Sequence, residues 1–336
     1  MANQEEDRRR YPRSLQGLLQ MAVNTSDDAE SSTDSSTFAS SVFQEMTEER
    51  RQWLQEALSS IAEDTDVKRM MTYLQILEKP QNDTDDDDDL TEKEDAFEGL
   101  SMIVDNLDNA NDFHKIGGYH VMTKCLSSEH SSLRLRAADI LAVCVQNNPY
   151  CQKAAMEMNI LPTLSTLLET DQSEQVKIKA LYAISCLTRD FPSAEEAFLK
   201  GDGFSILIRA MQGENEKLIT KSAFMLRNML VTNPLHKETL FKMGFIEQLV
   251  GLLRSPQNSS HEHIVSLLVT FVTDYPQGIS ECHRPEFDLE KILKSIITSS
   301  MEDDPDLHEE MILNCKELLN ICFNKQTQPN AGNNSR

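Results

Sequence analysis

A fourteen-residue pattern of apolar and polar positions occurs four times along the chain. The copies are RAADILAVCVQNNP (136–149), KALYAISCLTRDFP (179–192), KSAFMLRNMLVTNP (221–234) and HIVSLLVTFVTDYP (263–276). Positions 2, 5, 6 and 9 of the copies are apolar or small, which is the spacing of one face of an α-helix. The closing prolines, Pro149, Pro192, Pro234 and Pro276, are 43, 42 and 42 residues apart. This constant period indicates a structural repeat.

Each repeat combines three predicted helices. A short helix is followed by a break at Gly117-Gly118, Asn159, Gly201/Gly203 or Gly244, then by a middle helix, and then by the repeated pattern as a third helix. No stretch has the pattern of a strand. One short, one medium and one long helix in about 42 residues is typical of an armadillo unit. We therefore expect an all-α, armadillo-like, right-handed α-solenoid with four central repeats and a helical cap at each end, because a single repeat cannot bury its own apolar face.

The segments that flank the repeats differ from them in composition. Residues 1–45 are expected to be disordered, since 24–41 is nearly all Ser, Thr, Asp and Ala. Residues 46–104 are a predicted N-terminal cap with helices at 47–61, 66–78 and 92–107 and with a solvated acidic loop at 81–89. Thr91 and Glu94 match a capping box that would open the last of these helices. The repeats then span 105–281, a C-terminal cap spans 282–324, and the tail 325–336 is expected to be disordered.

One short amphipathic segment lies inside the disordered N-terminal region, at 14–23. Its apolar residues Leu15, Leu18 and Leu19 share one face of a predicted helix. Three interpretations remain open at this stage: a helix packed on the core, a docking segment on a flexible linker, or a frayed end.

The charge of the chain is concentrated at its ends. The formal net charge is −23, but residues 130–255 hold 14 basic and 13 acidic residues, so the flanks together carry −24. Nucleic acid is excluded as an expected partner, because its phosphates would be repelled by most of the chain.

Cysteine usage and the N-terminal sequence indicate the compartment. The seven cysteines include no CxxC pair, and the first residues are charged and lead into no long apolar stretch. We expect no signal peptide, no membrane-spanning segment and no membrane partner. A reduced, cytoplasmic protein with buried thiols fits best, and we expect it to be a monomer.

The polar face of the third helices is the candidate binding surface. Position 1 of the four copies is Arg136, Lys179, Lys221 and His263, and position 4 includes Asp139, Tyr182 and Phe224. Third helices line the concave side of an armadillo solenoid, so these positions predict a ladder of basic residues with two aromatics beside it. Such a ladder suits an acidic protein partner, although each position also fits an ordinary solvated site. The candidate residues are Arg134, Arg136, Asp139, Lys177, Lys179, Tyr182, Arg189, Lys221, Phe224, Arg227, Asn228 and His263.

Catalytic and metal-binding motifs are not found. The chain has no GxSxG, HExxH, Walker A or GxGxxG sequence. His261 and His263 are two apart and so do not share a helical face as zinc-binding histidines do. Cys282 and His283 are sequence neighbours, not an oriented nucleophile and base. We therefore expect a binding protein that is not an enzyme and that uses no cofactor or metal.

Several segments together resemble one family. LQGLLQMAV near the N-terminus, EERRQWLQEAL (48–58), DNLDNANDF (105–113), VKIKALYAISCLTR (176–189), KSAFMLRNMLV (221–231) and VTDYPQGISEC (272–282) are similar to the heat shock protein 70 binding proteins. These are cytosolic armadillo-type nucleotide exchange factors of the DnaK-class chaperone. The resemblance covers roughly residues 14–323. Two departures are the acidic loop 81–89 and a Ser/Thr/Asp-rich linker without a long glycine or proline tract.

The resemblance implies a mechanism and a partner. The concave face would clasp one lobe of the chaperone's ATPase domain and displace or distort the other, so that bound ADP loses its closed pocket. The flexible N-terminal segment, with Leu15, Leu18, Leu19 and Met21, would help to release the chaperone's client. A chaperone-associated ubiquitin ligase is a further candidate partner.

Two alternative functions use the same scaffold. An importin-like or catenin-like adaptor for extended peptides would need a ladder of Trp and Asn, but the only tryptophan, Trp53, lies outside the repeats. A ubiquitin-ligase inhibitor without exchange activity would use the same surface as the exchange factor, so it stays open.

Overall fold

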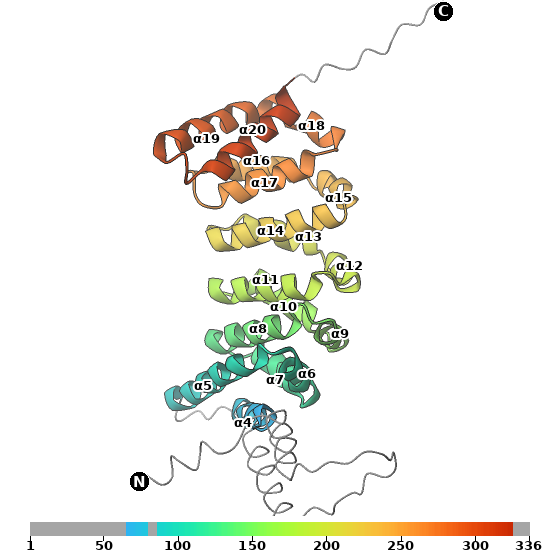
Figure 1. Ribbon diagram of the computed structural model, residues 1–336, viewed down its shortest axis with the longest axis vertical. Helices are drawn as coiled ribbons and strands as arrows, with labels where there is room; N and C mark the ends of the chain where they lie inside the picture. Colours follow the sequence, from blue (N-terminus) through green and yellow to red (C-terminus); the bar gives the residue numbers. More distant parts are fainter. Residues whose placement is uncertain (1–64, 80–85, 325–336) are drawn as a thin grey trace, which may run out of the picture. The chain divides into compact units, whose positions relative to one another are not determined.

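The computed structural model describes residues 65–79 and 86–324 (Figure 1). Within these ranges the regular elements are α-helices and one 3-10 turn, and no strand occurs. The chain divides into two compact units, Met1–Gln75 and Ile76–Arg336. Of the first unit, the described residues are 65–75, which form most of α4 (Asp66–Glu78). The predicted helix at 66–78 is therefore confirmed. The predicted helix at 47–61, the segment at 14–23 and the tail at 325–336 lie outside the described residues.

The second unit is built from triplets of helices that follow one another in a fixed order. The first helices are α6 (Leu107–Lys115), α9 (Pro149–Glu157), α12 (Pro192–Lys200), α15 (His236–Lys242) and α18 (Pro276–Cys282). The second are α7 (Gly118–Cys125), α10 (Ile160–Thr170), α13 (Gly203–Met211) and α16 (Phe245–Leu253). The third are α8 (Ser131–Val145), α11 (Glu174–Thr188), α14 (Glu216–Thr232) and α17 (His261–Val272). This order confirms the armadillo-like α-solenoid.

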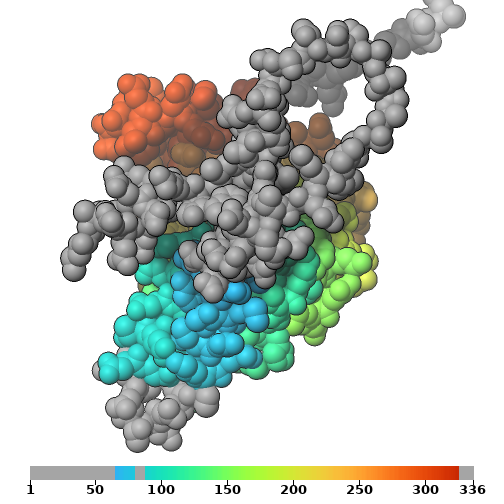
Figure 2. All heavy atoms as spheres, turned by 60° about the horizontal axis from the view of Figure 1, so that its bottom comes forward, coloured from blue at the N-terminus to red at the C-terminus, as the bar shows by residue number. Residues whose placement is uncertain are grey.

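The third helices form one continuous layer. Helix α5 (Asp86–Val104) packs on α8, α8 on α11, α11 on α14, α14 on α17, and α17 on α20 (Glu309–Phe323). Figure 1 shows these helices one above another, and the space-filling view shows neighbouring repeats as adjoining bands from cyan to yellow-green (Figure 2). The 3-10 turn Pro285–Phe287 and α19 (Leu289–Asp303) lie between α18 and α20 in the chain.

The core lies where the repeated pattern places it. Leu141, Ile184, Leu226 and Leu268, all at position 6 of the pattern, are at most 1% exposed. Burial of one such side chain contributes roughly 1.5–3 kcal/mol to stability. The apolar face of each third helix is therefore the seam on which neighbouring repeats stack.

The spacing of the prolines has a structural explanation. Two residues after the end of three third helices, one residue is in the left-handed conformation: Asn147 (φ 52°), Asp190 (φ 54°) or Asp274 (φ 54°). An extended residue follows, and then proline occupies the first position of the next helix. Proline suits this position because its fixed φ is helical and its missing N–H is not needed there. These three prolines mark the start of a new repeat, whereas Pro234 lies two residues before α15 begins.

The break between the first and second helices requires one left-handed residue. At three of the predicted breaks this residue is Gly117 (φ 89°), Asn159 (φ 58°) or Gly244 (φ 68°). In the third repeat the break also lies where it was predicted, between Lys200 and Gly203, and its left-handed residue is Asp202 (φ 62°). Aspartate tolerates this conformation because its short polar side chain can bond locally.

Gly203 is needed for close packing. A Cβ at this position would lie 2.6 Å from the ring of Phe198, and Gly118 stands in the same relation to Phe113. We expect Gly203→Ala to lower the free energy of unfolding by about 1–3 kcal/mol through overpacking. Gly251→Ala in α16 is the matched control, since a Cβ there meets nothing within 4 Å; it should be neutral or stabilise by up to about 1 kcal/mol. Urea unfolding measures both, and equal effects would contradict the assignment.

The acidic segment at 81–89 is only partly described, and the prediction of a loop over all of it is wrong. Helix α5 begins at Asp86, so 86–89 form its first turn and Thr91 is not its N-cap. Asp88 and Asp89 lie in this turn, where carboxylates are favourable because of the positive end of the helix dipole. Asp89 also pairs with Lys93 one turn later at 2.9 Å, in a largely buried position. The start of the helix is therefore set by electrostatics rather than by a capping box.

His261 makes the stability of the last repeat depend on pH. It is the first residue of α17, is 1% exposed, and its Nδ1 lies 3.0 Å from Asn258 Oδ1. Burial lowers the pKa of His261 below its ordinary value. The unfolded chain therefore binds more protons, and stability that is complete above about pH 6.5 is lost as the pH falls below it.

We accordingly expect the unfolding midpoint of the wild type to fall on going from about pH 7.5 to about pH 5.5 more steeply than that of His261→Gln. Thermal unfolding followed by circular dichroism measures the difference. His263→Gln removes an imidazole at a half-exposed neighbouring position and is the matched control. Parallel slopes for the wild type and His261→Gln would show that His261 does not titrate with folding.

Candidate functional site

We define the third-helix face as the solvent-accessible side of α8, α11, α14 and α17, where the predicted ladder lies. All twelve predicted residues are described, and the side chain of none is fully buried. The structure does not bring all of them into one site. Ten belong to this face or its margins, whereas Arg134 and Lys177 are engaged by other partners near the N-terminal ends of α8 and α11.

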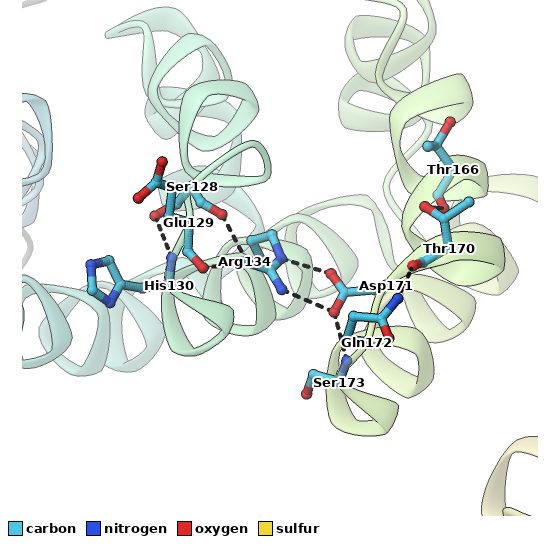
Figure 3. Close-up of polar contacts among 9 residues, drawn as sticks. All are labelled: Ser128, Glu129, His130, Arg134, Thr166, Thr170, Asp171, Gln172 and Ser173. Carbon is cyan, nitrogen blue, oxygen red and sulfur yellow. Dashed lines mark hydrogen bonds and ion pairs between the residues drawn. The ribbon is translucent and has the colours of Figure 1, made fainter.

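Arg134 is a structural residue, contrary to its place in the predicted ladder. Its Nε and one terminal nitrogen donate to Asp171 at 2.6 and 2.9 Å, and the other donates to the Ser128 and Glu129 carbonyls at 2.8 Å (Figure 3). The side chains of Arg134 and Asp171 are 16% and 2% exposed. The pair joins the first two repeats, so Arg134 has little left to offer a partner.

Lys177 also lies apart from the ladder. Its Nζ pairs with Glu174 at 2.9 Å, one turn earlier on α11. Both residues line a crevice of about 730 Å³ between α10 and α13, together with the ion pair of Arg209 and Glu169. The structure therefore places Lys177 at the N-terminal end of the third helices, where its charge is already compensated.

The middle of the face is joined across repeats by polar contacts. Lys179 Nζ pairs with Asp139 at 2.7 Å, and the Tyr182 hydroxyl donates to Gln146 Oε1 at 3.1 Å. Arg136 lies 3.5 Å from Glu94 of α5. These contacts hold α5, α8 and α11 in register and neutralise two of the ladder cations.

Tyr182 connects the second and third repeats. The ammonium groups of Lys179 and Lys221 lie 6.0 and 5.7 Å from the centroid of its ring. Burial raises the pKa of the Tyr182 hydroxyl, so the ring stays neutral at physiological pH and offers its face to both cations. Lys221 itself is exposed and has no ion pair to a carboxylate in the part of the chain that the structure describes. It is thus an uncompensated cation on this face.

A crevice opens on the face between α11 and α14. It has a volume of about 800 Å³ and is lined by Arg189, Phe224, Asn228 and Val231, among others. Phe224 is 46% exposed and Val231 62% exposed. Large apolar side chains on an open surface are characteristic of interaction sites, and aromatic residues at such sites often dominate the binding energy.

A second crevice continues the face toward the C-terminal end of the second unit. It has a volume of about 480 Å³ and is lined by Arg227, Val231, Thr270, Asn314 and Glu317, among others. Arg227 Nε and Asn314 Nδ2 are buried and have no hydrogen-bond partner within the described residues. These unpaired donors would gain from an acceptor supplied by a partner.

Several accessible residues were not predicted. Val231 occupies position 11 of the repeated pattern, and its apolar character at a polar position was a signal in the sequence. Leu235 is 82% exposed in the turn between α14 and α15, and Glu317 belongs to α20. Neither could be found from the repeat alone, because Leu235 lies just after the last residue of the third copy and α20 is not a copy of the pattern.

The residues that the structure describes contain neither a candidate metal site nor a candidate membrane-spanning helix. They include no group of three or more His, Cys, Asp or Glu side chains that could hold a metal ion. Among them, no helix combines the length and the apolar character that crossing a bilayer requires.

The architecture defines a class of protein: an armadillo-type solenoid whose third helices present a polar and aromatic face. Solved structures support this class. A designed armadillo repeat protein in complex with the peptide (KR)4 has a TM-score of 0.59 at 17% identity, over 76% of this chain and all of that chain. An armadillo repeats only protein from Plasmodium falciparum has a TM-score of 0.50 at 20% identity, over 62% and 95%.

Sequence comparison narrows the class to a family. Residues 15–113 match the model of nucleotide exchange factor Fes1, and 109–243 match the SIL1/FES1/HPBP1 C-terminal domain. Hsp70-binding protein 1 of Homo sapiens is 39% identical over 94% of this chain and 86% of that protein. The corresponding protein of Mus musculus is 38% identical over 95% and 88%, and nucleotide exchange factor SIL1 of Xenopus laevis 28% over 60% and 49%. The chain belongs to the Hsp70-binding protein 1 family of nucleotide exchange factors.

Proposed function

We propose that this protein is a nucleotide exchange factor and co-chaperone of Hsp70, and that it binds the chaperone's ATPase domain through the third-helix face. Membership of the Hsp70-binding protein 1 family carries the proposal. The open face supports it, because repeat solenoids use the curved surface of their stacked helices for extended contacts. We also propose that the protein is not an enzyme and works in the cytoplasm; its seven cysteines are free thiols, as a reducing compartment favours.

The exchange mechanism follows from differential binding. A stacked array of helices is stiff, so its face complements only one arrangement of a two-lobed partner. If it binds the open form of the ATPase domain better than the closed form, its binding free energy opposes closure around ADP. The nucleotide and the exchange factor then each weaken the binding of the other by the same factor. This mechanism requires shape and charge on the third-helix face but no catalytic residue.

The decisive experiment is the release of a fluorescent ADP analogue from an Hsp70 chaperone, measured by stopped flow with and without this protein. We expect a large acceleration that saturates with concentration. A complex that forms without acceleration would favour a chaperone-associated ubiquitin-ligase inhibitor over an exchange factor. Failure to form any complex with Hsp70 would contradict the proposed function altogether.

A further inference from the structure

One copy of the repeated pattern carries an arginine where the other three copies carry small or apolar residues. Position 7 is Ala142, Ser185 and Val269 in those three copies and Arg227 in the copy on α14. Ala142 and Val269 are 0% and 8% exposed, so the position normally serves the packing of repeats. A half-buried guanidinium is unusual there, because charged side chains seldom leave water without a partner. Stacking of the repeats therefore does not explain Arg227.

Arg227 lines the crevice of about 480 Å³ at the C-terminal end of the third-helix face. Three helices form this crevice: Arg227 and Val231 belong to α14, Thr270 to α17, and Asn314 and Glu317 to α20. Figure 1 shows α17 between α14 and α20. Side chains from three successive layers of the stack thus meet around one hollow.

Two hydrogen-bond donors in the crevice are buried without an acceptor. They are Nε of Arg227 and Nδ2 of Asn314, from helices on opposite sides of α17. Arg227 forms no hydrogen bond or ion pair with any other residue that the structure describes. The donors have already lost their contact with water in the free protein, so an acceptor that reaches them gains hydrogen bonds without a further desolvation cost on this side.

The other charged groups of the crevice do not supply that acceptor. Lys237 is 8% exposed, and its Nζ donates to the carbonyl oxygen of Thr273 at 2.6 Å. Asp274 and Glu317 are exposed and line the same crevice. Neither carboxylate is paired with Arg227, although both contribute negative charge to its surroundings. A ligand therefore has to compete with Glu317 for the guanidinium.

We infer that this crevice is a carboxylate-binding site, in which Arg227 and Asn314 together receive the side chain of one aspartate or glutamate of the partner. The inference rests on the proposed function, which makes this partner the Hsp70 ATPase domain. A guanidinium can donate to both oxygens of a carboxylate, and the amide of Asn314 adds a donor from a second helix. A neutral acceptor, such as a peptide carbonyl, would leave the charge of Arg227 uncompensated.

Opposite charge changes within the crevice should act in opposite directions. Arg227→Gln should weaken binding of the ATPase domain by at least about 30-fold, mainly through faster dissociation. Glu317→Gln should strengthen it about threefold, because a competing negative charge is removed. Lys200→Gln and Glu196→Gln on α12 make the same charge changes at sites that are 74% and 68% exposed, and should bind like the wild type. Surface plasmon resonance measures all four variants.

A cross-link without a spacer identifies the carboxylate. Carbodiimide joins a carboxylate to a lysine amine but not to a guanidinium. Arg227→Lys, combined with Glu317→Gln, should therefore give a linked peptide with an acidic residue of the ATPase domain that the wild type does not give. Neutralising that acidic residue in the chaperone should weaken binding of the wild type but not weaken binding of Arg227→Gln any further.

Urea unfolding separates a binding role of Arg227 from a structural one. Arg227→Gln should keep or raise the wild-type stability, since it removes a charge that has no partner in the free protein. Lower stability of Arg227→Gln, equal weakening by the α12 controls, or coupling only to residues of its own chain would overturn the inference. Wild-type affinity and ADP release with Arg227→Gln would overturn it and leave the proposed function intact. Failure of the wild type to bind Hsp70 would overturn both.

Discussion

Replacing Asp171 by alanine should lower the free energy of unfolding by about 3–5 kcal/mol, because it leaves the guanidinium of Arg134 without its carboxylate in a largely desolvated position. Asp171 is 2% exposed and accepts two hydrogen bonds from Arg134 and one from the backbone N–H of Ser173. The contact joins helices of two repeats, so its loss should loosen the stack rather than one helix. Urea unfolding, with hydrogen exchange of α8 and α11, measures the effect.

The ion pair of Arg134 and Asp171 should also make the stability of the protein depend on pH. Burial raises the pKa of the Asp171 carboxyl, but the hydrogen bonds from Arg134 and Ser173 outweigh it and hold the pKa below its usual range. The contribution of the pair to stability is therefore complete above the unfolded pKa of about 4 and is lost as the pH falls below it. The difference in stability between the wild type and Asp171→Asn should shrink accordingly in acid.

A double-mutant cycle and an exposed pair provide the controls. Arg134→Ala and Asp171→Ala together should cost less than the sum of the single changes, since the double variant leaves no unpaired charge. Glu238→Ala removes the partner of Lys242, at 2.7 Å but about 70% exposed, and should cost less than about 1 kcal/mol. Equal costs for Asp171→Ala and Glu238→Ala would contradict the structural role of Asp171.

The second large effect is expected on partner binding. Phe224→Ala should weaken the complex with the Hsp70 ATPase domain by at least about 30-fold, the scale of an exposed aromatic anchor at the centre of an interface. Lys221→Glu should weaken it by roughly tenfold, mainly through a slower association that depends on salt. Surface plasmon resonance at two ionic strengths separates the two contributions, and ADP release should slow in parallel.

Lys221 is a better probe of charge than its neighbours in the ladder. Reversing Arg136 or Lys179 would also break a contact with Glu94 or Asp139, so a loss of binding could reflect a change in the scaffold. Lys221 has no such pair among the described residues, and its change should leave the stability almost unaltered.

The matched controls for Lys221→Glu and Phe224→Ala are substitutions on the first helices of the repeats. Lys200→Glu on α12 makes the same change of net charge at a site that is 74% exposed, and Leu107→Ala on α6 truncates an apolar side chain that is 57% exposed. Both should bind Hsp70 like the wild type. If the controls weaken binding while Lys221→Glu and Phe224→Ala do not, the partner binds a different surface.

Arg134 and Arg136 show where prediction from the sequence reaches its limit. They are two residues apart on the same helix and were both assigned to the ladder. The structure holds Arg134 in a buried pair with Asp171, 37 residues further along the chain, and leaves Arg136 half-exposed beside Glu94. Helical periodicity predicts the direction in which a side chain points from its own helix. It does not predict whether another part of the chain places an ion-pair partner beside it.

Of two helix starts in the N-terminal cap, the sequence predicted one correctly and the other incorrectly. The start of α4 near Asp66 followed from the sequence, whereas α5 begins at Asp86 instead of after Thr91. The capping box and the acidic first turn are competing signals of comparable energy. The largely buried ion pair of Asp89 and Lys93, one turn apart within α5, adds to the second of them.

By itself the sequence determined the helical class, the repeat period, the buried positions and the family. These are local or periodic properties, since each repeat stacks only on its neighbours and meets the same environment as the last. Only the tertiary structure decided which cations are neutralised and where a crevice opens between α11 and α14. Those features depend on distances between residues about 40 positions apart, which small differences in packing between repeats set and no periodic pattern encodes.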